Sequence, residues 1–278
     1  MKSDFVGIEA ADFISHFAKA KYFIIRRIIS YRIAIFHYIQ RSALIYHRFY
    51  AIIRPRGDDM ISYFDLEYKD KLYLDLHLPE SDSFDLFVYF HGGGLCGGNR
   101  KGFEAFSESL AKRNIATASV EYRMYPEAKF PDYIEDGADA IRWLKDHISK
   151  WGECTRVFVG GSSAGGYISM MLCFDNRFLQ AVGLEPTDID GYIHDAGQPT
   201  SHFNVLKELE KDSRRVIVDE TAPMYFVGTS DHYSPMLFIV SANDMLGRYE
   251  QTMLLVNVLN HFGHKENVFL SVQNGKHC

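Results

Sequence analysis

The sequence predicts an α/β fold in which about eight strands form a central, mostly parallel sheet with helices on both faces and a helical cap. Apolar strand-like runs alternate with helical patterns between residues 84 and 273, which favours parallel strands joined by helices. Two period-two segments precede this alternation. Residues 13–57 and 178–232 do not follow it, and we assign both segments to the cap.

The first half of the predicted sheet begins with an antiparallel strand pair. "ISYFDLEY" (61–68) and "KLYLDLHL" (71–78) alternate with period two around the short link "KD". "FDLFVYF" (84–90) is the run of a buried strand, and "IATASVEY" (115–122) is another. An amphipathic helix at 102–114 separates these two strands.

The second half of the sheet is predicted from longer patterns. "PDYIEDGADAIRWLKDHISKWG" (131–152) has Pro near its start, acidic residues in its first half and Gly after its end, as a helix does. In chain order, the other expected elements are a strand at 155–161, a helix at 164–174, a strand at 235–242, a helix at 248–262 and a strand at 267–273. No regular element is expected within 178–232.

Charge divides the chain into two predicted parts. Residues 13–57 carry nine Lys or Arg and no acidic residue, so the rest of the chain sums to −15 within a total of −6. We therefore expect an N-terminal basic and apolar cap segment at 1–57, and a catalytic domain at 58–278 that contains a cap-like insertion at 178–232. The basic segment either packs as helices on the main domain or makes weak peripheral contact with an anionic membrane.

Composition excludes several classes of function. The acidic main domain argues against nucleic-acid binding, because phosphate binding needs clustered cations. No HExxH or Cys/His ligand pattern is present, so we expect no metal and no other cofactor. The cysteines show no CxxC pair and the N-terminus lacks a secretory signal, which together predict a cytoplasmic protein with reduced thiols. The sequence does not indicate the oligomeric state.

The stretch "GGSSAGG" (160–166) predicts a nucleophile elbow. It lies between a strand and a helix, and only the frame that starts at Gly161 fits the pattern GxSxG, which makes Ser163 the nucleophile. "HGGG" (91–94) directly follows another strand. This pattern supplies backbone N–H groups to an oxyanion hole, for which we expect Gly93, Gly94 and Ala164.

A serine nucleophile needs a base and an acid, in the chain order Ser, Asp or Glu, His for this architecture. Asp244 in "FIVSAND" follows the carboxyl end of a strand and is the expected acid, whereas Asp231 precedes that strand. His277 follows the last strand after a short loop and is the expected base. The two other late histidines lie at the end of the helix 248–262, on the opposite rim of the sheet.

Five ordered segments together resemble the α/β-hydrolase superfamily, specifically its hormone-sensitive-lipase-like carboxylesterase branch. They are "HGGG", "VEYRMYPEAKFPDYIEDGADAIRWL", "GGSSAGG", "SANDML" and "GKHC", and the resemblance covers roughly residues 60–278. It implies an α/β-hydrolase fold and a serine carboxylesterase that hydrolyses short- or medium-chain acyl esters through an acyl-enzyme, without a cofactor. The resemblance also has departures. Ser162 stands where many members carry an acid, and one residue follows His277 where members continue into a helix, so we expect weak support for His277.

The sequence also offers candidate pocket residues and leaves two alternative functions open. Leu95, Ser162, His194 and Asp195 are candidate contacts to a small-molecule ester, and Tyr22, Phe23, Phe36 and Phe203 are candidates for the lining of the cap. The same triad could instead hydrolyse amides, as in an arylformamidase or a small peptidase. A non-catalytic small-molecule-binding relative is the alternative from another class.

Overall fold

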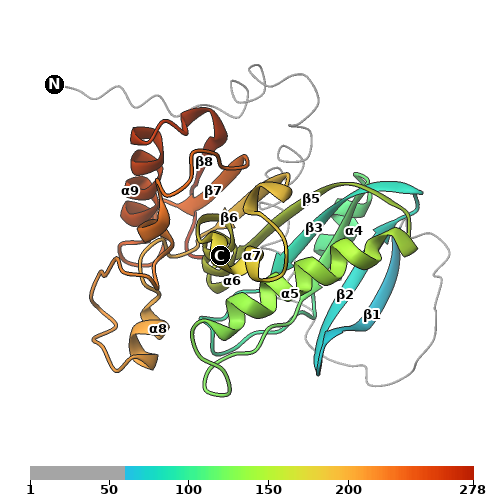
Figure 1. The fold of residues 1–278 in the computed structure, drawn as a ribbon, viewed down its shortest axis with the longest axis horizontal. Coiled ribbons are helices and arrows are strands. Elements are labelled where there is room, and N and C mark those ends of the chain that lie inside the picture. The colour runs from blue at the N-terminus through green and yellow to red at the C-terminus, as the bar shows by residue number, and fades with distance from the viewer. Residues whose placement is uncertain (1–59) are drawn as a thin grey trace. The chain divides into compact units, whose positions relative to one another are not determined.

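The computed structural model describes residues 60–278 and confirms the α/β-hydrolase sheet, with eight strands in the order β1-β2-β4-β3-β5-β6-β7-β8 (Figure 1). The strands are β1 (Met60–Lys69), β2 (Leu72–Pro79), β3 (Ser83–Phe90), β4 (Ile115–Val120), β5 (Glu153–Ser162), β6 (Gly191–Asp195), β7 (Met236–Ser241) and β8 (Val268–Gln273). The helices are α4 (Glu104–Ala111), α5 (Asp132–His147), α6 (Ala164–Phe174), α7 (Asn176–Ala181), α8 (Phe203–Glu208) and α9 (Arg248–His261). Expectations for 1–57, including Tyr22, Phe23 and Phe36, lie outside the described residues.

Strand directions follow the sequence pattern. β1 and β2 pair antiparallel, as their period-two alternation predicts, and β2 is also antiparallel to β4. All the other neighbouring strands are parallel. After β3 the chain crosses to β4 on one side, and β5 then returns to the other side of β3. The order therefore reverses between β3 and β5, the place where ligands bind in open α/β sheets.

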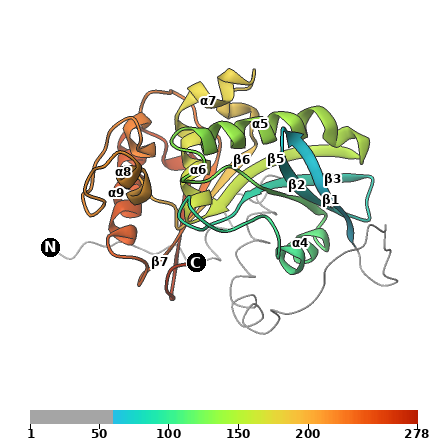
Figure 2. The same ribbon diagram turned by 90° about the horizontal axis from the view of Figure 1, so that it is seen from below.

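Helices cover both faces of the sheet. In Figure 2, α5 and α7 lie above the strands and α4 lies below them. Every residue of α6 is buried, which explains why its sequence is apolar on all sides. α5 packs closely on α6 at Gly137, where a Cβ atom would lie 3.3 Å from Ile168. Between residues 60 and 278, no helix combines the length and hydropathy needed for a transmembrane span.

Strand β6, helix α8 and the end of α7 correct the expectation that residues 178–232 hold no regular element. "GYIHD" forms a parallel strand between β5 and β7. The strand could not be recognised from the sequence pattern because it has only five residues, and two of them, Gly191 and Asp195, are of types that are depleted in strands. The two flanking strands supply the pairing that the local sequence does not favour.

Candidate active site

The turn between β5 and α6 holds Ser163 in a conformation that is rare for a residue other than glycine, with φ 54° and ψ −109°. Two backbone hydrogen bonds hold it there, from Ser163 N to Asp195 O (2.8 Å) and from Tyr167 N to Ser163 O (3.0 Å). The turn presses on the end of β3, since a Cβ atom at Gly165 would lie 1.9 Å from Phe90 O. This close approach to β3 explains why residue 165 is a glycine.

Ser163, His277 and Asp244 meet in one hydrogen-bonded chain. His277 Nε2 lies 2.8 Å from Ser163 Oγ, and His277 Nδ1 lies 2.5 Å from Asp244 Oδ1. Because an ionised carboxylate only accepts hydrogen bonds, Nδ1 carries the proton and Nε2 of the neutral ring is left to accept from the serine. The sequence predicted the same three residues from three separate segments of the chain.

Asp244 is fixed by its own backbone surroundings. Its side chain is completely buried, and it accepts hydrogen bonds from Met245 N (2.7 Å) and Ser241 N (3.3 Å). These contacts orient the carboxylate towards His277, whose side chain is 24% exposed. The imidazole is thus tied to the domain through Asp244, although it is partly open to solvent.

The glycine-rich loop after β3 faces the serine. Gly93 and Gly94 both have positive φ, at 123° and 68°, and both line the same cavity as Ser163. Ala164 is the first residue of α6, where backbone N–H groups have no partner inside the helix and the helix dipole favours negative charge. The predicted oxyanion-hole residues therefore surround the serine from two sides.

A cavity of about 560 Å³ opens at this point. Five parts of the chain contribute to it: the end of β3 with its glycine loop, the β5–α6 turn, α8, the segment after β7 and the segment after β8. The lining residues are Tyr89, Gly92, Gly93, Gly94, Ser162, Ser163, Phe203, Met245, His277 and Cys278. Tyr89, Met245 and Cys278 were not predicted as site residues. Tyr89 lies two residues before "HGGG", whereas Met245 and Cys278 belong to the recognised segments "SANDML" and "GKHC".

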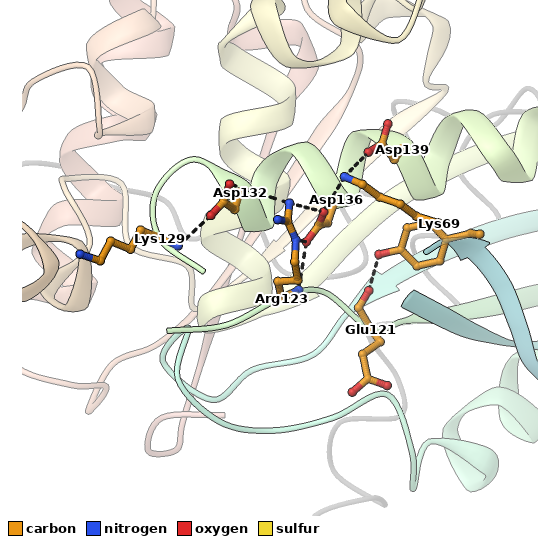
Figure 3. A network of polar contacts seen from close by, with 8 residues as sticks. Lys69, Glu121, Arg123, Lys129, Asp132, Asp136 and Asp139 are labelled. Atoms are coloured by element: carbon orange, nitrogen blue, oxygen red, sulfur yellow. Dashed lines mark hydrogen bonds and ion pairs between the residues drawn. The ribbon is translucent and has the colours of Figure 1, made fainter. Parts of the chain in front are cut away.

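A network of ion pairs fixes the segment between β4 and α5 (Figure 3). Arg123 donates to the fully buried carboxylate of Asp136 from Nε and Nη2, both at 2.8 Å, and from its backbone N at 3.0 Å. Lys69 from β1 bonds Asp136 at 2.9 Å and Asp139 at 2.6 Å. The segment is thereby attached to α5 and to the first strand.

The same segment supports the glycine-rich loop. Tyr122 donates its hydroxyl hydrogen to His91 O (2.7 Å), its ring stacks on the His91 ring at 4.4 Å, and Tyr125 N donates to Leu95 O (2.9 Å). This explains the Tyr, Arg and Asp of the motif "YRMYPEAKFPDYIED". They hold the glycine-rich loop in place and lie outside the cavity lining.

Ser162 stands at the position where the family resemblance implies an acid, and the carboxyl group of Asp195 reaches it. Ser162 Oγ donates to Asp195 Oδ2 at 3.0 Å and accepts from the Tyr89 hydroxyl at 3.1 Å. Ser162 lines the cavity, whereas Asp195 does not and acts through Ser162. β6 therefore places a carboxyl group beside the elbow, which itself carries none.

Three of the four expected substrate contacts, Leu95, His194 and Asp195, do not line the cavity, and this corrects the sequence analysis. Successive strand residues point to opposite faces of a sheet, so His194 points away from the Asp195 side, towards Phe174 and Phe238. Its Nδ1 lies 2.9 Å from Ser169 Oγ. The side chain of Leu95 is completely buried and contributes to the hydrophobic core.

Two buried histidines should make the free energy of unfolding depend on pH. Burial lowers the pKa of both His194 and His202 to about 3, whereas an unfolded histidine has a pKa of about 6.5. The stability that each neutral ring contributes is complete above pH 6.5 and is lost as the pH falls towards 3. At pH 5 each group should destabilise the fold by about 2 kcal/mol.

Urea denaturation of wild type and His194→Asn at pH 7.5 and pH 5.0 measures this effect. The variant should lose less stability between the two pH values than wild type does. The exposed His261 offers a matched control, since His261→Asn should keep the wild-type pH dependence. Equal pH dependence in wild type and His194→Asn would contradict the assignment.

Between residues 60 and 278, no group of three or more His, Cys, Asp or Glu side chains is arranged to hold a metal ion. The sheet order, the strained serine between strand and helix, and the glycine loop on the neighbouring strand together define the α/β-hydrolase class. A family model described as alpha/beta hydrolase fold matches residues 87–257, more than half of the chain. The chain belongs to this family, in its hormone-sensitive-lipase-like carboxylesterase branch.

Comparisons with known proteins agree with this assignment. Probable carboxylesterase 6 of Arabidopsis thaliana is 35% identical over 162 residues, which cover 55% of this chain and 46% of that protein. Arylacetamide deacetylase-like 2 of Homo sapiens is 31% identical over 125 residues, covering 42% and 31%. A truncated carbohydrate esterase from gut microbiota has a similar fold, with a TM-score of 0.67 and 20% identity over 80% of this chain and 91% of that chain. The matches span less than half the length of the two curated relatives.

Proposed function

We propose that this protein is a serine carboxylesterase that hydrolyses short- or medium-chain acyl esters through an acyl-enzyme. The observation that carries the proposal is the hydrogen-bonded chain from Ser163 through His277 to Asp244, at a cavity lined by the glycine loop. The cavity of about 560 Å³ is in the size range of small-molecule sites. The relatives named as carboxylesterases support an ester as substrate.

The proposed first half-reaction forms the acyl-enzyme. Ser163 Oγ attacks the ester carbonyl carbon while His277 Nε2 takes the hydroxyl proton. The N–H groups of Gly93, Gly94 and Ala164 stabilise the oxyanion of the tetrahedral intermediate. The bond between the carbonyl carbon and the alcohol oxygen then breaks, and His277 returns the proton to the leaving alcohol.

The second half-reaction releases the acid. Water gives a proton to His277 and adds to the acyl carbonyl, and the bond to Ser163 Oγ breaks as His277 returns that proton to the serine. Asp244 stays ionised throughout, keeps the proton of the neutral ring on Nδ1 and stabilises the imidazolium form. The same groups act in both halves, and no cofactor takes part.

Amide hydrolysis is the second candidate, because one relative is named as an arylacetamide deacetylase-like protein. The purified protein should hydrolyse p-nitrophenyl acetate and p-nitrophenyl butyrate with a higher kcat/KM than a matched aryl formamide or acetanilide. A higher kcat/KM for an amide would replace esterase by amidase as the function. If no substrate is turned over and a fluorophosphonate probe does not label the protein, a non-catalytic binding role is favoured.

A further inference from the structure

The glycine-rich loop at the candidate oxyanion hole cannot set its own geometry. Gly93 and Gly94 have no side chains, and glycine populates many backbone conformations. The positions of their N–H groups must therefore come from contacts that hold the loop carbonyls. Two of these contacts are local: His91 Nδ1 lies 2.7 Å from Gly92 O, and Cys96 N donates to Gly93 O at 3.3 Å.

The third carbonyl is held from a distant part of the sequence. The side-chain amide of Asn204, in the first turn of α8, donates from Nδ2 to Gly94 O. The amide lies tightly against the loop, since a Cβ atom at Gly94 would be 3.0 Å from Asn204 Nδ2. The opposite amide orientation would place Oδ1 against the carbonyl oxygen, and the two acceptors would repel each other.

Asn204 is itself held by buried polar groups. Its backbone N donates to His202 Nδ1 at 3.2 Å. Burial lowers the pKa of this ring to about 3, so the ring is neutral at neutral pH, and the bond from Asn204 N requires the ring proton to be on Nε2. Phe203 N donates to Gln198 Oε1 at 3.4 Å, and this oxygen also accepts from Arg248 Nη2 at 3.3 Å. The start of α8 is thus connected to α9, which follows the Asp244 segment.

We propose that Asn204 is a positioning residue of the oxyanion hole, an inference that rests on the proposed esterase function. The carbonyl of Gly93 lies in the same peptide plane as the N–H of Gly94, and Cys96 holds it. Asn204 holds the next carbonyl along the chain. With the peptide groups on both sides fixed, Gly94 cannot rotate, and its N–H keeps one direction while negative charge develops on the substrate.

The test compares kcat and KM for p-nitrophenyl butyrate in wild type, Asn204→Asp and Asn204→Ala. The aspartate has nearly the same shape but offers no donor to Gly94 O. We expect kcat to fall about 10- to 100-fold in both variants while KM stays within about 2-fold, because only the transition state carries the oxyanion. Asn204→Gln keeps an amide donor and should recover part of the loss seen in Asn204→Ala.

Asn267→Asp is the matched control. Asn267 Nδ2 donates to Tyr233 O at 3.0 Å, a bond of the same kind at the amino end of β8, far along the strand from the site. This variant should keep the wild-type kcat and KM. Its thermal midpoint shows what the loss of such a bond does to folding alone.

A transition-state analogue separates positioning from a general loss of structure. The inhibition constant of an alkyl trifluoromethyl ketone, which forms an oxyanion on Ser163, should weaken in the Asn204 variants by the same factor as kcat/KM. Unchanged kcat in Asn204→Asp and Asn204→Ala would overturn the inference while wild-type turnover preserves the esterase function. A fall in kcat that is fully explained by the fraction of unfolded protein in each variant would also overturn the inference. A wild type without turnover or labelling would remove both proposals.

Discussion

Replacing Ser163 with alanine should lower kcat for p-nitrophenyl butyrate by about 10⁴-fold or more, because the hydroxyl that His277 Nε2 contacts is lost. The substitution removes one hydroxyl and keeps the backbone contacts of the turn, so the thermal midpoint should stay close to that of wild type. A colorimetric ester assay and a fluorophosphonate labelling gel measure the two consequences. Labelling should be absent in the variant.

The neighbouring serine provides the sharpest comparison. Ser162 bonds Asp195 and Tyr89, whereas His277 contacts Ser163. Ser162→Ala should therefore keep fluorophosphonate labelling at a measurable rate. Labelling that persists in Ser163→Ala and disappears in Ser162→Ala would reverse the assignment of the nucleophile.

Replacing Asp244 with asparagine should lower kcat by about 10³- to 10⁴-fold with little change in KM. An asparagine amide can donate to His277 Nδ1, which would move the ring proton to Nε2. The ring could then no longer accept the proton of Ser163. Stopped-flow or steady-state ester hydrolysis by the purified variant measures the loss.

Asp231→Asn is the control for this substitution. Asp231 is exposed and precedes β7, whereas Asp244 follows that strand and is buried beside His277. The control should retain wild-type kcat and KM. Loss of activity in Asp231→Asn together with full activity in Asp244→Asn would show that the acid had been assigned to the wrong end of the strand.

Most of the sheet could be predicted because its strands carry their pattern locally. The period-two pattern of β1 and the apolar run of β7 can be recognised without knowing which strands pair with them. β6 was missed because its five residues form a strand only between two neighbours that pair with both of its edges. His194 and Asp195 were both expected at the substrate, and strand alternation sends only Asp195 towards the elbow.

Local sequence patterns identify the groups that can do chemistry. The elbow and the glycine loop are short segments whose backbone conformation requires particular residues. Ser163, Gly93 and Gly94 can therefore be recognised from the residues next to them in the sequence. Asp244 and His277 could be selected because each lies in the loop that follows the carboxyl end of a predicted strand. These predictions depend on local geometry and on chain order.

The distant side chains that support those groups are identified by the packing of the folded domain. Asp195 reaches Ser162 because β5 and β6 are adjacent and in register. Asn204 reaches Gly94 O because α8 packs on a loop 110 residues earlier in the chain. No local pattern encodes either contact, since a hydrogen bond between remote segments depends on how the whole domain packs and not on the residues that flank each partner.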